Sequence, residues 1–497
     1  FSTIAVRKEE GDRMEEEKEI IVAKEREHAI DMRRDEVGDS KESANGVEEE
    51  KKVGPEAVEV KRSRRVAALD AFRGLTIVLM ILVDDAGGAY ERIDHSPWNG
   101  CTLADFVMPF FLFIVGVAIA LAFKRVPKLS DAVKKILLRT LKLLFWGLLL
   151  QGGYSHAPDD LSYGVDMKKI RWCGILQFDF YHLPLMWNKQ RIALVYLVVA
   201  LIEALTRKVR PTVVASGPIA IFDAYRWQWI GGFVAFVVYM VTTFSLYVPD
   251  WSYVFHSDGD VNDGKRFTVK CGVRGHFDPA CNAVGYVDRQ DCTDSSPNMG
   301  LLRVDAASWC LAPFEPEGLL SSVSAILSGT IGIHYGHVLI HFKSHSERLK
   351  HWMIMALSLL ICAVILHSTN AIPLNKQLYS FSYVCFTAGA AGIVLSAFYI
   401  LIDVWGLRMP FLFLEWIGMN AMLVFVMAAQ GIFPAFVNGW YYENPDHSLV
   451  HWIFKHIFVK VWHSERLGTL LYVIFAEILF WGVVAGILHK LKIYWKL

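Results

Sequence analysis

The feature that most constrains this chain is the recurrence of long apolar runs after residue 65. A helix needs about 20 residues to cross a hydrocarbon core of about 30 Å. The runs are continuous rather than alternating, which favours helices over barrel strands. The sequence therefore predicts an all-α polytopic membrane protein, a bundle of about ten transmembrane helices over residues 68–87, 103–123, 132–150, 191–205, 227–248, 318–341, 352–367, 379–404, 411–436 and 467–488.

Composition narrows the class of protein further. Hydrophobic residues make up 54% of the 497 residues and charged residues only 20%, which is too apolar for an ordinary soluble chain of this length. Fifty basic side chains match fifty acidic ones, so the formal net charge is zero and a nucleic-acid partner has no support. Membrane lipid is the expected surrounding medium.

Residues 1–65 differ from the rest of the chain. They carry both charges at high density and almost no aromatic side chains, as in MEEEKEIIVAKEREH and KRSRR. Such a segment buries too little apolar surface to offset the entropy lost on ordering. We therefore predict a disordered, charged tail over 1–65 and one multi-span domain over 66–497.

Basic residues in the short connections predict the orientation of the runs, because cytosolic loops are enriched in Lys and Arg. Basic clusters follow the second, fourth and sixth runs and also flank both ends of the domain, so both termini are predicted to be cytosolic. The long segment 249–317 is then lumenal. An oxidising lumen would allow three alternative pairings of its four cysteines, Cys271, Cys281, Cys292 and Cys310.

The densest group of polar residues lies in HSPWNGCTLADFVMPFFLFIVG, which begins at His95. The pKa of histidine lies nearest to neutrality, so His95 can take a proton from an ammonium or hydroxyl nucleophile. Asn99 belongs to a tight polar turn before an apolar helix, Thr102 can cap that helix, and Asp105 lies near its positive end. A lone loop histidine is usually inert, and it is the surrounding turn that makes His95 a catalytic candidate.

Polar side chains inside the apolar runs are the next candidates, because they are costly in lipid and usually functional. In the first run Asp70 and Arg73 can pair on one helix face, whereas Asp84 has no basic neighbour within one turn. Asn420 lies in mid-run and must find a hydrogen bond inside the bundle, for which structural packing and ligand contact are equal explanations.

Two further groups lie near the ends of runs. The segment IPLNKQLYSFSYV brings polar groups to a predicted lumenal helix entry, among them Asn375, Lys376 and Tyr383. A stripe at helical spacing on the sixth run has no carboxylate or thiol neighbour and is not predicted to bind a metal: His334, His337 and His341.

Several motifs occur together in the order typical of one known family. They are LDAFRG, HSPWNGCTLADFVMPFFLFIVG, FEPEGLLSSVSAI, IPLNKQLYSFSYV, IGMNAML and LKIYWKL. Over residues 65–497 the chain resembles the heparan-alpha-glucosaminide N-acetyltransferase family, and most of all a plant member. The resemblance implies an enzyme that moves acetyl from cytosolic acetyl-CoA to an amine or hydroxyl of a lumenal amino sugar or glycan. It also implies an endomembrane of the vacuolar or lysosomal type, and a homodimer.

The resemblance implies roles for individual residues as well. His95 matches the family's proposed active histidine, and Asp84 stands where animal members have asparagine. The expected catalytic residues are His95, Asn99, Asp105 and Asp84. Anionic acetyl-CoA should stay near basic and polar groups, which by position are Arg73, Arg139, Lys142, Arg191 and Asn420. The residues expected to contact the acceptor are Trp98, Asn375, Lys376 and Tyr383.

Two departures from the family pattern resemble splice-boundary errors in a gene model. Residues 178–190 form an insertion ahead of Arg191, and the lumenal loop is shortened after Arg289. Pro184 disfavours an unbroken helix through the insertion, so we predict that the segment is extruded as a poorly ordered loop at the edge of the helix or that the span breaks there.

A transporter or permease for a small polar or sugar-like solute is the alternative function. About ten helices with intramembrane Asp and Arg would also suit translocation. No inverted repeat is evident, and the polar motifs cluster instead of recurring in two halves, which favours the enzyme.

Overall fold

The computed structural model describes residues 66–123, 128–149, 188–206, 220–255, 266–290, 301–303, 319–429, 433, 440–442 and 444–495. The charged segment 1–65, residues 178–187 of the insertion, Cys292 and Cys310 lie outside them. Predictions made for those residues stay predictions. Residues 188–190 of the insertion form the first turn of a helix that continues through Arg191.

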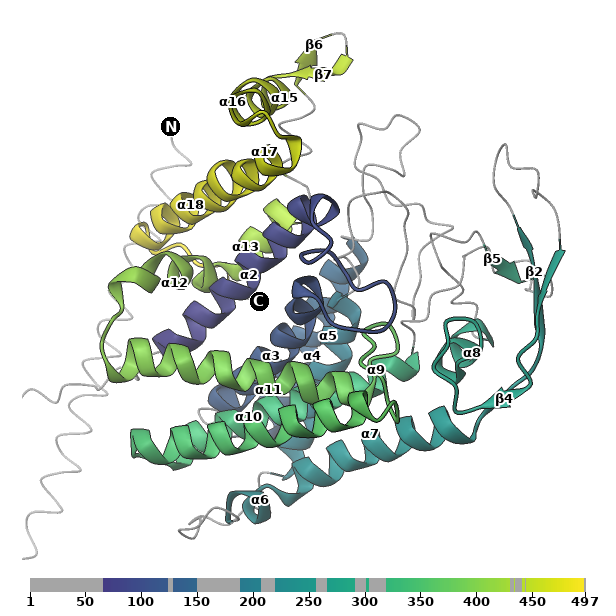
Figure 1. Ribbon diagram of the computed structural model, residues 1–497. Helices are drawn as coiled ribbons and strands as arrows, with labels where there is room; N and C mark the ends of the chain where they lie inside the picture. Colours follow the sequence, from purple (N-terminus) through teal and green to yellow (C-terminus); the bar gives the residue numbers. More distant parts are fainter. Residues whose placement is uncertain are drawn as a thin grey trace, which may run out of the picture. The chain divides into compact units, whose positions relative to one another are not determined.

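Helices make up most of the described part of the chain (Figure 1). The helices that coincide with predicted runs are α2 (Ala67–Ala86), α3 (Val107–Phe123), α4 (Leu129–Leu149), α5 (Asn188–Leu205), α7 (Arg226–Ser245), α9 (Leu319–His341), α10 (His345–Ser368), α11 (Phe381–Phe398), α12 (Leu412–Met419) and α18 (Leu479–Lys490). Three of them are extended by wider π-helical turns, η5 (Tyr399–Val404) after α11, η7 (Phe425–Ala429) beyond α12 and α13 (Ala421–Val424), and η9 (Val473–Ile478) between α17 (Glu465–Tyr472) and α18.

Within the described ranges, six helical stretches are long and apolar enough to cross a membrane: Leu103–Phe123, Arg226–Ser245, Leu320–His341, His345–Ser368, Phe381–Val404 and Glu465–Lys490. A seventh is reached if Met409–Met419 and Ala421–Ala428, which meet at a bend of 69°, form one span. The chain is therefore a helical, multi-pass membrane protein. The predicted number of about ten spans is not confirmed.

The three remaining predicted spans, α2, α4 and α5, are helical but carry several charged side chains. Asp70, Arg73, Asp84 and Asp85 lie on α2, and α4 carries Arg139 among five charged residues, Asp131, Lys134, Lys135, Arg139 and Lys142. Charged groups are costly in hydrocarbon unless they face the bundle interior or water.

Glycines allow the helices around the site to cross closely. A Cβ atom on Gly116 of α3 would overlap the carbonyl oxygen of Gly329 on α9, and one on Gly418 of α12 would overlap that of Asp70 on α2. Such close backbone approach replaces the hydrophobic effect as the source of helix association in lipid. The crossings fix α2 and α3, the two helices that flank the loop carrying His95.

The strands are short and lie mainly between α7 and α9. Strand β1 (Tyr247–Val248) pairs with β4 (Val273–Arg274), and β2 (Trp251–Phe255) lies between β3 (Arg266–Val269) and β5 (Leu301–Arg303), all antiparallel. Helix α8 (Ala283–Gln290) follows β4. A disulfide joins Cys271 to Cys281, whereas Cys292 and Cys310 lie outside the described residues.

A hairpin and a helical stretch lie between η7 and α17 in the described part of the chain. Strands β6 (Tyr441–Tyr442) and β7 (Asn444–Ser448) make an antiparallel hairpin. A helical stretch follows, made of α15 (Leu449–Ile453), η8 (Phe454–Val459) and α16 (Lys460–Trp462). Short helices complete the described elements, namely η1 (Gly87–Ala89), η2 (Leu103–Phe106), α6 (Ala220–Ala224) and η6 (Met409–Phe411).

Candidate active site

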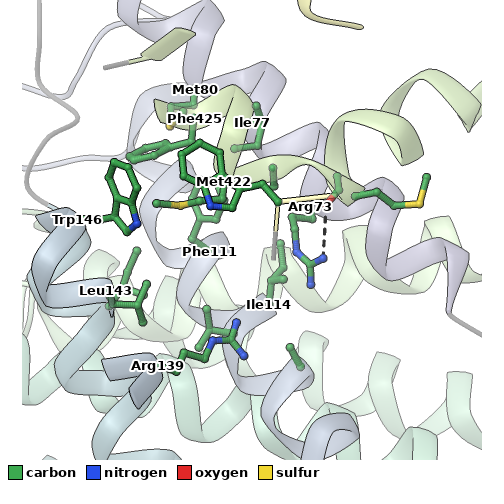
Figure 2. A pocket seen from close by; sticks show the side chains of 17 residues that line it. Arg73, Ile77, Met80, Phe111, Ile114, Arg139, Leu143, Trp146, Met422 and Phe425 are labelled. Atoms are coloured by element: carbon green, nitrogen blue, oxygen red, sulfur yellow. Dashed lines mark hydrogen bonds between the residues drawn. The ribbon is translucent and has the colours of Figure 1, made fainter. Parts of the chain in front are cut away.

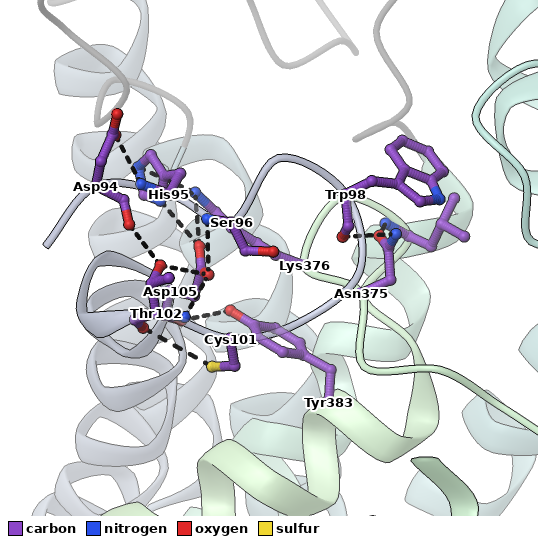
Figure 3. Close-up of polar contacts among 11 residues, drawn as sticks. Asp94, His95, Ser96, Trp98, Cys101, Thr102, Asp105, Asn375, Lys376 and Tyr383 are labelled. Atoms are coloured by element: carbon purple, nitrogen blue, oxygen red, sulfur yellow. Dashed lines mark hydrogen bonds and ion pairs between the residues drawn. The ribbon is translucent and has the colours of Figure 1, made fainter. Parts of the chain in front are cut away.

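Two loops that are far apart in the sequence meet at the candidate site (Figure 3). The first joins α2 to η2 and carries His95, and the second joins α10 to α11 and carries Lys376. Asn99 of the first loop and Asn375 of the second form an isolated antiparallel bridge. The polar segments that the sequence singles out separately therefore form one cluster.

Asp105 organises the first loop. Its fully buried carboxylate places Oδ1 2.9 Å from Nδ1 of His95. Oδ2 accepts hydrogen bonds from the backbone N–H groups of Ser96 (3.3 Å) and Thr102 (3.0 Å) and from the Thr102 hydroxyl (3.0 Å). Thr102 and Asp105 thus form a capping box, as the sequence suggests for this helix start. A carboxylate at Nδ1 holds the imidazole proton there and leaves Nε2 as the basic nitrogen.

Lys376 approaches the same imidazole from the second loop. Its Nζ lies 2.9 Å from Nδ1 and 3.2 Å from Nε2 of His95, and 3.8 Å from Oδ1 of Asp105. The side chains of His95 and Lys376 are 19% and 18% exposed, whereas that of Asp105 is not exposed. A reactant can therefore reach the imidazole but not its carboxylate partner.

Burial and nearby charges set the protonation state of the cluster. Burial lowers the pKa of His95 below its ordinary value of 6.5, Lys376 lowers it further, and Asp105 and Asp94 oppose both effects. The imidazole therefore stays neutral to a lower pH than that of an ordinary histidine. The neutral form is the one that a general base or a nucleophile requires. Burial, reinforced by Asp105, raises the pKa of the Cys101 thiol well above its usual range, so this thiol is not an activated nucleophile.

Asn375 holds the two loops together. Its side chain is completely buried, and Nδ2 donates to the Trp98 carbonyl (3.0 Å) and to Oδ1 of Asn99 (3.3 Å). Its Oδ1 accepts the backbone N–H of Leu378 at 2.8 Å. Asn375 was predicted to contact the acceptor, but the contacts that the structure shows are positioning contacts within the protein.

Two other predicted acceptor residues also have partners within the protein. The Trp98 indole N–H donates to the Phe277 carbonyl at 2.8 Å, which ties the loop to the segment after β4. The Tyr383 hydroxyl donates to the Asp105 carbonyl at 2.5 Å from the first turn of α11. Of the residues predicted to contact the acceptor, Lys376 is the one whose side-chain polar group lies against the imidazole.

Asp84 lies at the end of α2 beside this cluster. Its side chain is 7% exposed, and neither carboxylate oxygen has a hydrogen-bond partner in the part of the chain that the structure describes. Asp85, Lys376 and Glu477 of η9 lie within electrostatic range of it, and Glu477 shares a hydrogen bond with Asp85. Glu477 was missed as a candidate, although an acidic residue inside an apolar run is a usable signal.

A cavity of about 300 Å³ lies between α2, α3, α4 and the bend of the α12–α13 pair (Figure 2). Its charged lining groups are Arg73 and Arg139, and its other walls are mainly apolar. Arg73 pairs with Asp70 at 3.1 Å, whereas Nε of Arg139 is buried without a partner among the described residues. Apolar walls with a few polar groups are typical of ligand sites. The aromatic and thioether lining, missed from sequence, includes Phe111, Trp146, Met422 and Phe425.

Asn420 lies beside this cavity, between two pairs of lining residues, Gly418 and Met419, and Ala421 and Met422. It is completely buried, and its Oδ1 accepts the backbone N–H of Trp495 at 3.3 Å. Its Nδ2 has no partner among the described residues. The position explains why a polar residue occurs in this apolar run, because the helix is interrupted there.

Two other predicted donor residues do not line the cavity. Lys142 is exposed on α4. Arg191 is 2% exposed, and its guanidinium donates to the hydroxyls of Ser321 (2.6 Å) and Ser322 (3.3 Å) at the start of α9. The structure brings Arg73 and Arg139 together but leaves Lys142 and Arg191 apart from them.

The histidine stripe of α9 packs against α5 and the α6–α7 corner. His337 lies 3.3 Å from a carboxylate oxygen of Glu203, and Nε2 of His341 lies 2.6 Å from the Tyr225 hydroxyl. Within the described ranges, no group of three or more His, Cys, Asp or Glu side chains is arranged to hold a metal ion.

Comparison with known proteins gives matches over most of the chain. Residues 65–246 match the family model described as heparan-alpha-glucosaminide N-acetyltransferase, catalytic. The human heparan-alpha-glucosaminide N-acetyltransferase is 27% identical over 462 residues, which cover 87% of this chain and 60% of the human protein. The mouse protein of the same name is 28% identical over 465 residues, covering 88% and 62%. The chain thus spans about three fifths of the length of these curated relatives.

Proposed function

We propose that the chain is a member of the heparan-alpha-glucosaminide N-acetyltransferase family, which its similarity to the catalytic family model and to the human and mouse enzymes supports. We propose further that it is a membrane acetyltransferase that moves acetyl from acetyl-CoA to an amine or hydroxyl of an amino sugar or glycan. With an amine acceptor, the new C–N bond replaces the thioester C–S bond. The proton that the nitrogen loses ends on the CoA thiol or in solvent. The observation that carries the proposal is the partly exposed His95 imidazole held by the buried Asp105.

His95 supplies the chemistry through Nε2. As a general base it takes the acceptor proton during direct attack on the thioester, and the imidazolium then protonates the departing thiolate. As a nucleophile it forms an acetyl-imidazole that the acceptor subsequently cleaves. Asp105 at Nδ1 stabilises the positive imidazole in either route. Asn99 and Asp84 complete the proposed catalytic group.

The cavity between α2, α3, α4 and the α12–α13 bend is the proposed donor site. Acetyl-CoA carries several phosphate charges and a long, weakly polar arm. Arg73 and Arg139 suit the charged part because guanidinium groups bind phosphate oxygens in pairs, and the apolar walls suit the arm. Three residues outside the cavity lining are also proposed to bind the donor, namely Lys142, Arg191 and Asn420.

We propose that both termini are cytosolic and that residues 249–317 are lumenal in a vacuolar or lysosomal type of membrane. The Cys271–Cys281 disulfide supports this side for the segment, because disulfides persist in oxidising compartments. Residues 1–65 form a charged cytosolic tail and 66–497 the catalytic domain. Trp98, Asn375, Lys376 and Tyr383 are the proposed acceptor-side residues, and the working unit is a homodimer.

The test uses the purified full-length chain in detergent with acetyl-CoA and glucosamine. We expect release of free CoA thiol together with N-acetylated sugar. His95→Ala should lower this turnover by about 10²- to 10⁴-fold, the usual cost of removing a general base. His276→Ala, at an exposed histidine outside the cluster, is the matched control. Uptake of the sugar into proteoliposomes without acetylation would instead support the transporter alternative.

A further inference from the structure

His95, Asp105 and Lys376 lie together at the centre of the site. The lysine makes the charge balance of this group different from that of a simple His–Asp pair. A buried carboxylate beside a histidine ordinarily favours the protonated imidazolium, because the two opposite charges attract. Here Lys376 supplies a positive charge 3.8 Å from Oδ1 of Asp105 and within 3.2 Å of both imidazole nitrogens of His95. One carboxylate is thus already balanced by one ammonium.

A second proton on His95 would therefore place two positive charges against one negative charge in a largely buried cluster. Two unit charges about 3 Å apart repel by several kcal/mol even at an effective dielectric constant of about 20. The pKa of His95 is lowered by burial and further by Lys376, in agreement with this geometry.

Among the residues that the structure describes, the other charged groups named around His95 and Lys376 are carboxylates from the His95 loop, α2 and η9. From its own loop, the Asp94 carboxylate accepts the His95 backbone N–H at 2.6 Å. From α2, Asp84 lies within electrostatic range of Lys376, with Asp85 and Glu477 beyond it. The Cys101 thiol is held protonated and neutral by the rise in its pKa. Of the groups that act on His95, Lys376 is the positive one.

We propose that Lys376 is a positioning residue that balances the charge of Asp105 and so keeps His95 as a neutral imidazole with its proton on Nδ1, which allows acetyl transfer to proceed at acidic pH. The proposal rests on the proposed function only in that His95 acts in the transfer. It gives Lys376 a role distinct from direct contact with the acceptor.

The same geometry leaves Nε2 available for the reaction. Because Nδ1–H donates to Asp105, the free lone pair of the imidazole is that of Nε2. Nζ of Lys376 lies 2.9 Å from Nδ1 and 3.2 Å from Nε2, so it lies against the ring and not along that lone pair, which points away from Nδ1 in the ring plane. Lys376 can therefore act on the imidazole without blocking it.

The direct test measures the protonation of His95 without using acetyl transfer. Full-length protein is treated with diethyl pyrocarbonate at a series of pH values, and mass spectrometry follows modification of the peptide that contains His95. The reagent attacks the unprotonated imidazole, so the midpoint of the curve reports the His95 pKa. We expect Lys376→Met to raise the midpoint by about one pH unit or more, and Asp105→Asn to lower it.

Lys376→Arg keeps the positive charge and should give the wild-type midpoint. If Lys376→Met does not fold, Lys376→Gln and Asp105→Asn provide the same test. Loss of the lysine charge must raise the midpoint, and loss of the aspartate charge must lower it. An unchanged midpoint in a folded, charge-neutral Lys376 variant would overturn the proposal. Absence of transferase activity in the wild type would overturn the proposed function but leave this titration readable.

Activity provides the second readout. Lys376→Met should lose acetyl transfer by about tenfold or more near pH 5 relative to the wild type and recover most of it near pH 8, as the raised pKa is passed. Lys376→Arg should retain transfer at both pH values. A loss of equal size at every pH would instead identify an acceptor-binding or purely structural role for Lys376, and would refute the role in protonation.

Discussion

Oδ1 of Asp105 lies 2.9 Å from Nδ1 of His95, and the two residues are ten positions apart across a capped helix start. We expect Asp105→Asn to lower the turnover number for acetyl transfer by about 10²- to 10⁴-fold, because an amide can donate to Nδ1 and favours the wrong tautomer. Thermal unfolding is the control, because Asp105 also belongs to the capping box. The free energy of unfolding of the variant should fall by about 1 kcal/mol or less. Wild-type turnover in this variant would contradict the role given to Asp105.

Asn375 is expected to contribute chiefly to stability. Asn375→Ala removes the side-chain hydrogen bonds to Trp98, Asn99 and Leu378 and leaves buried backbone groups unsatisfied, for a loss of about 1–3 kcal/mol. Thermal unfolding in detergent measures this loss. Gln377→Ala in the same loop is the matched control and should change the unfolding temperature little. Equal stability of the two variants would show that the loops do not depend on Asn375.

Arg139 is expected to act in donor binding. Arg139→Gln should raise the KM for acetyl-CoA by about tenfold or more, since charge-assisted hydrogen bonds contribute about 1.5–3 kcal/mol. The KM for the sugar should stay within a factor of about two, because the cavity is separate from the His95 loop. Lys135→Gln, exposed on the same helix, is the control. A selective rise in the sugar KM would place the acceptor in this cavity instead.

The α3–α9 crossing should not tolerate a larger side chain at Gly116. Gly116→Leu would force the helices apart, because even a Cβ atom there overlaps the carbonyl oxygen of Gly329. We expect little folded protein by size-exclusion chromatography in detergent. Gly88→Ala, where an added Cβ meets no atom within 4 Å, should elute like the wild type. Normal elution of Gly116→Leu would mean that the two helices are not in close contact.

His95 should make wild-type transfer depend on pH in a defined direction. Since burial and then Lys376 lower the pKa of its imidazole, the active neutral form persists below the ordinary value of 6.5 and is lost only as pH falls through the lowered pKa. A profile of turnover against pH should therefore have its acidic limb below about pH 6.5. An acidic limb above that value would conflict with the environment of His95.

The apolar runs determined where helices form, since length and continuous hydrophobicity are local properties of the sequence. Every predicted run coincides with a helix in at least part of its length, and the Thr102–Asp105 cap is readable from four consecutive residues. The number of spans is harder to predict, because α2, α4 and α5 carry charged side chains whose cost depends on what they face.

Only the tertiary structure decided which polar residues meet. Lys376 reaches His95 across 281 positions, and Arg73 shares a cavity with Arg139, whereas Arg191, equally basic, faces two serines instead. The physical reason is that pairing depends on helix crossings set by close contacts such as that of Gly418 with Asp70. Those contacts join residues that are far apart in the sequence, so the hydrophobic periodicity of a local segment does not predict them.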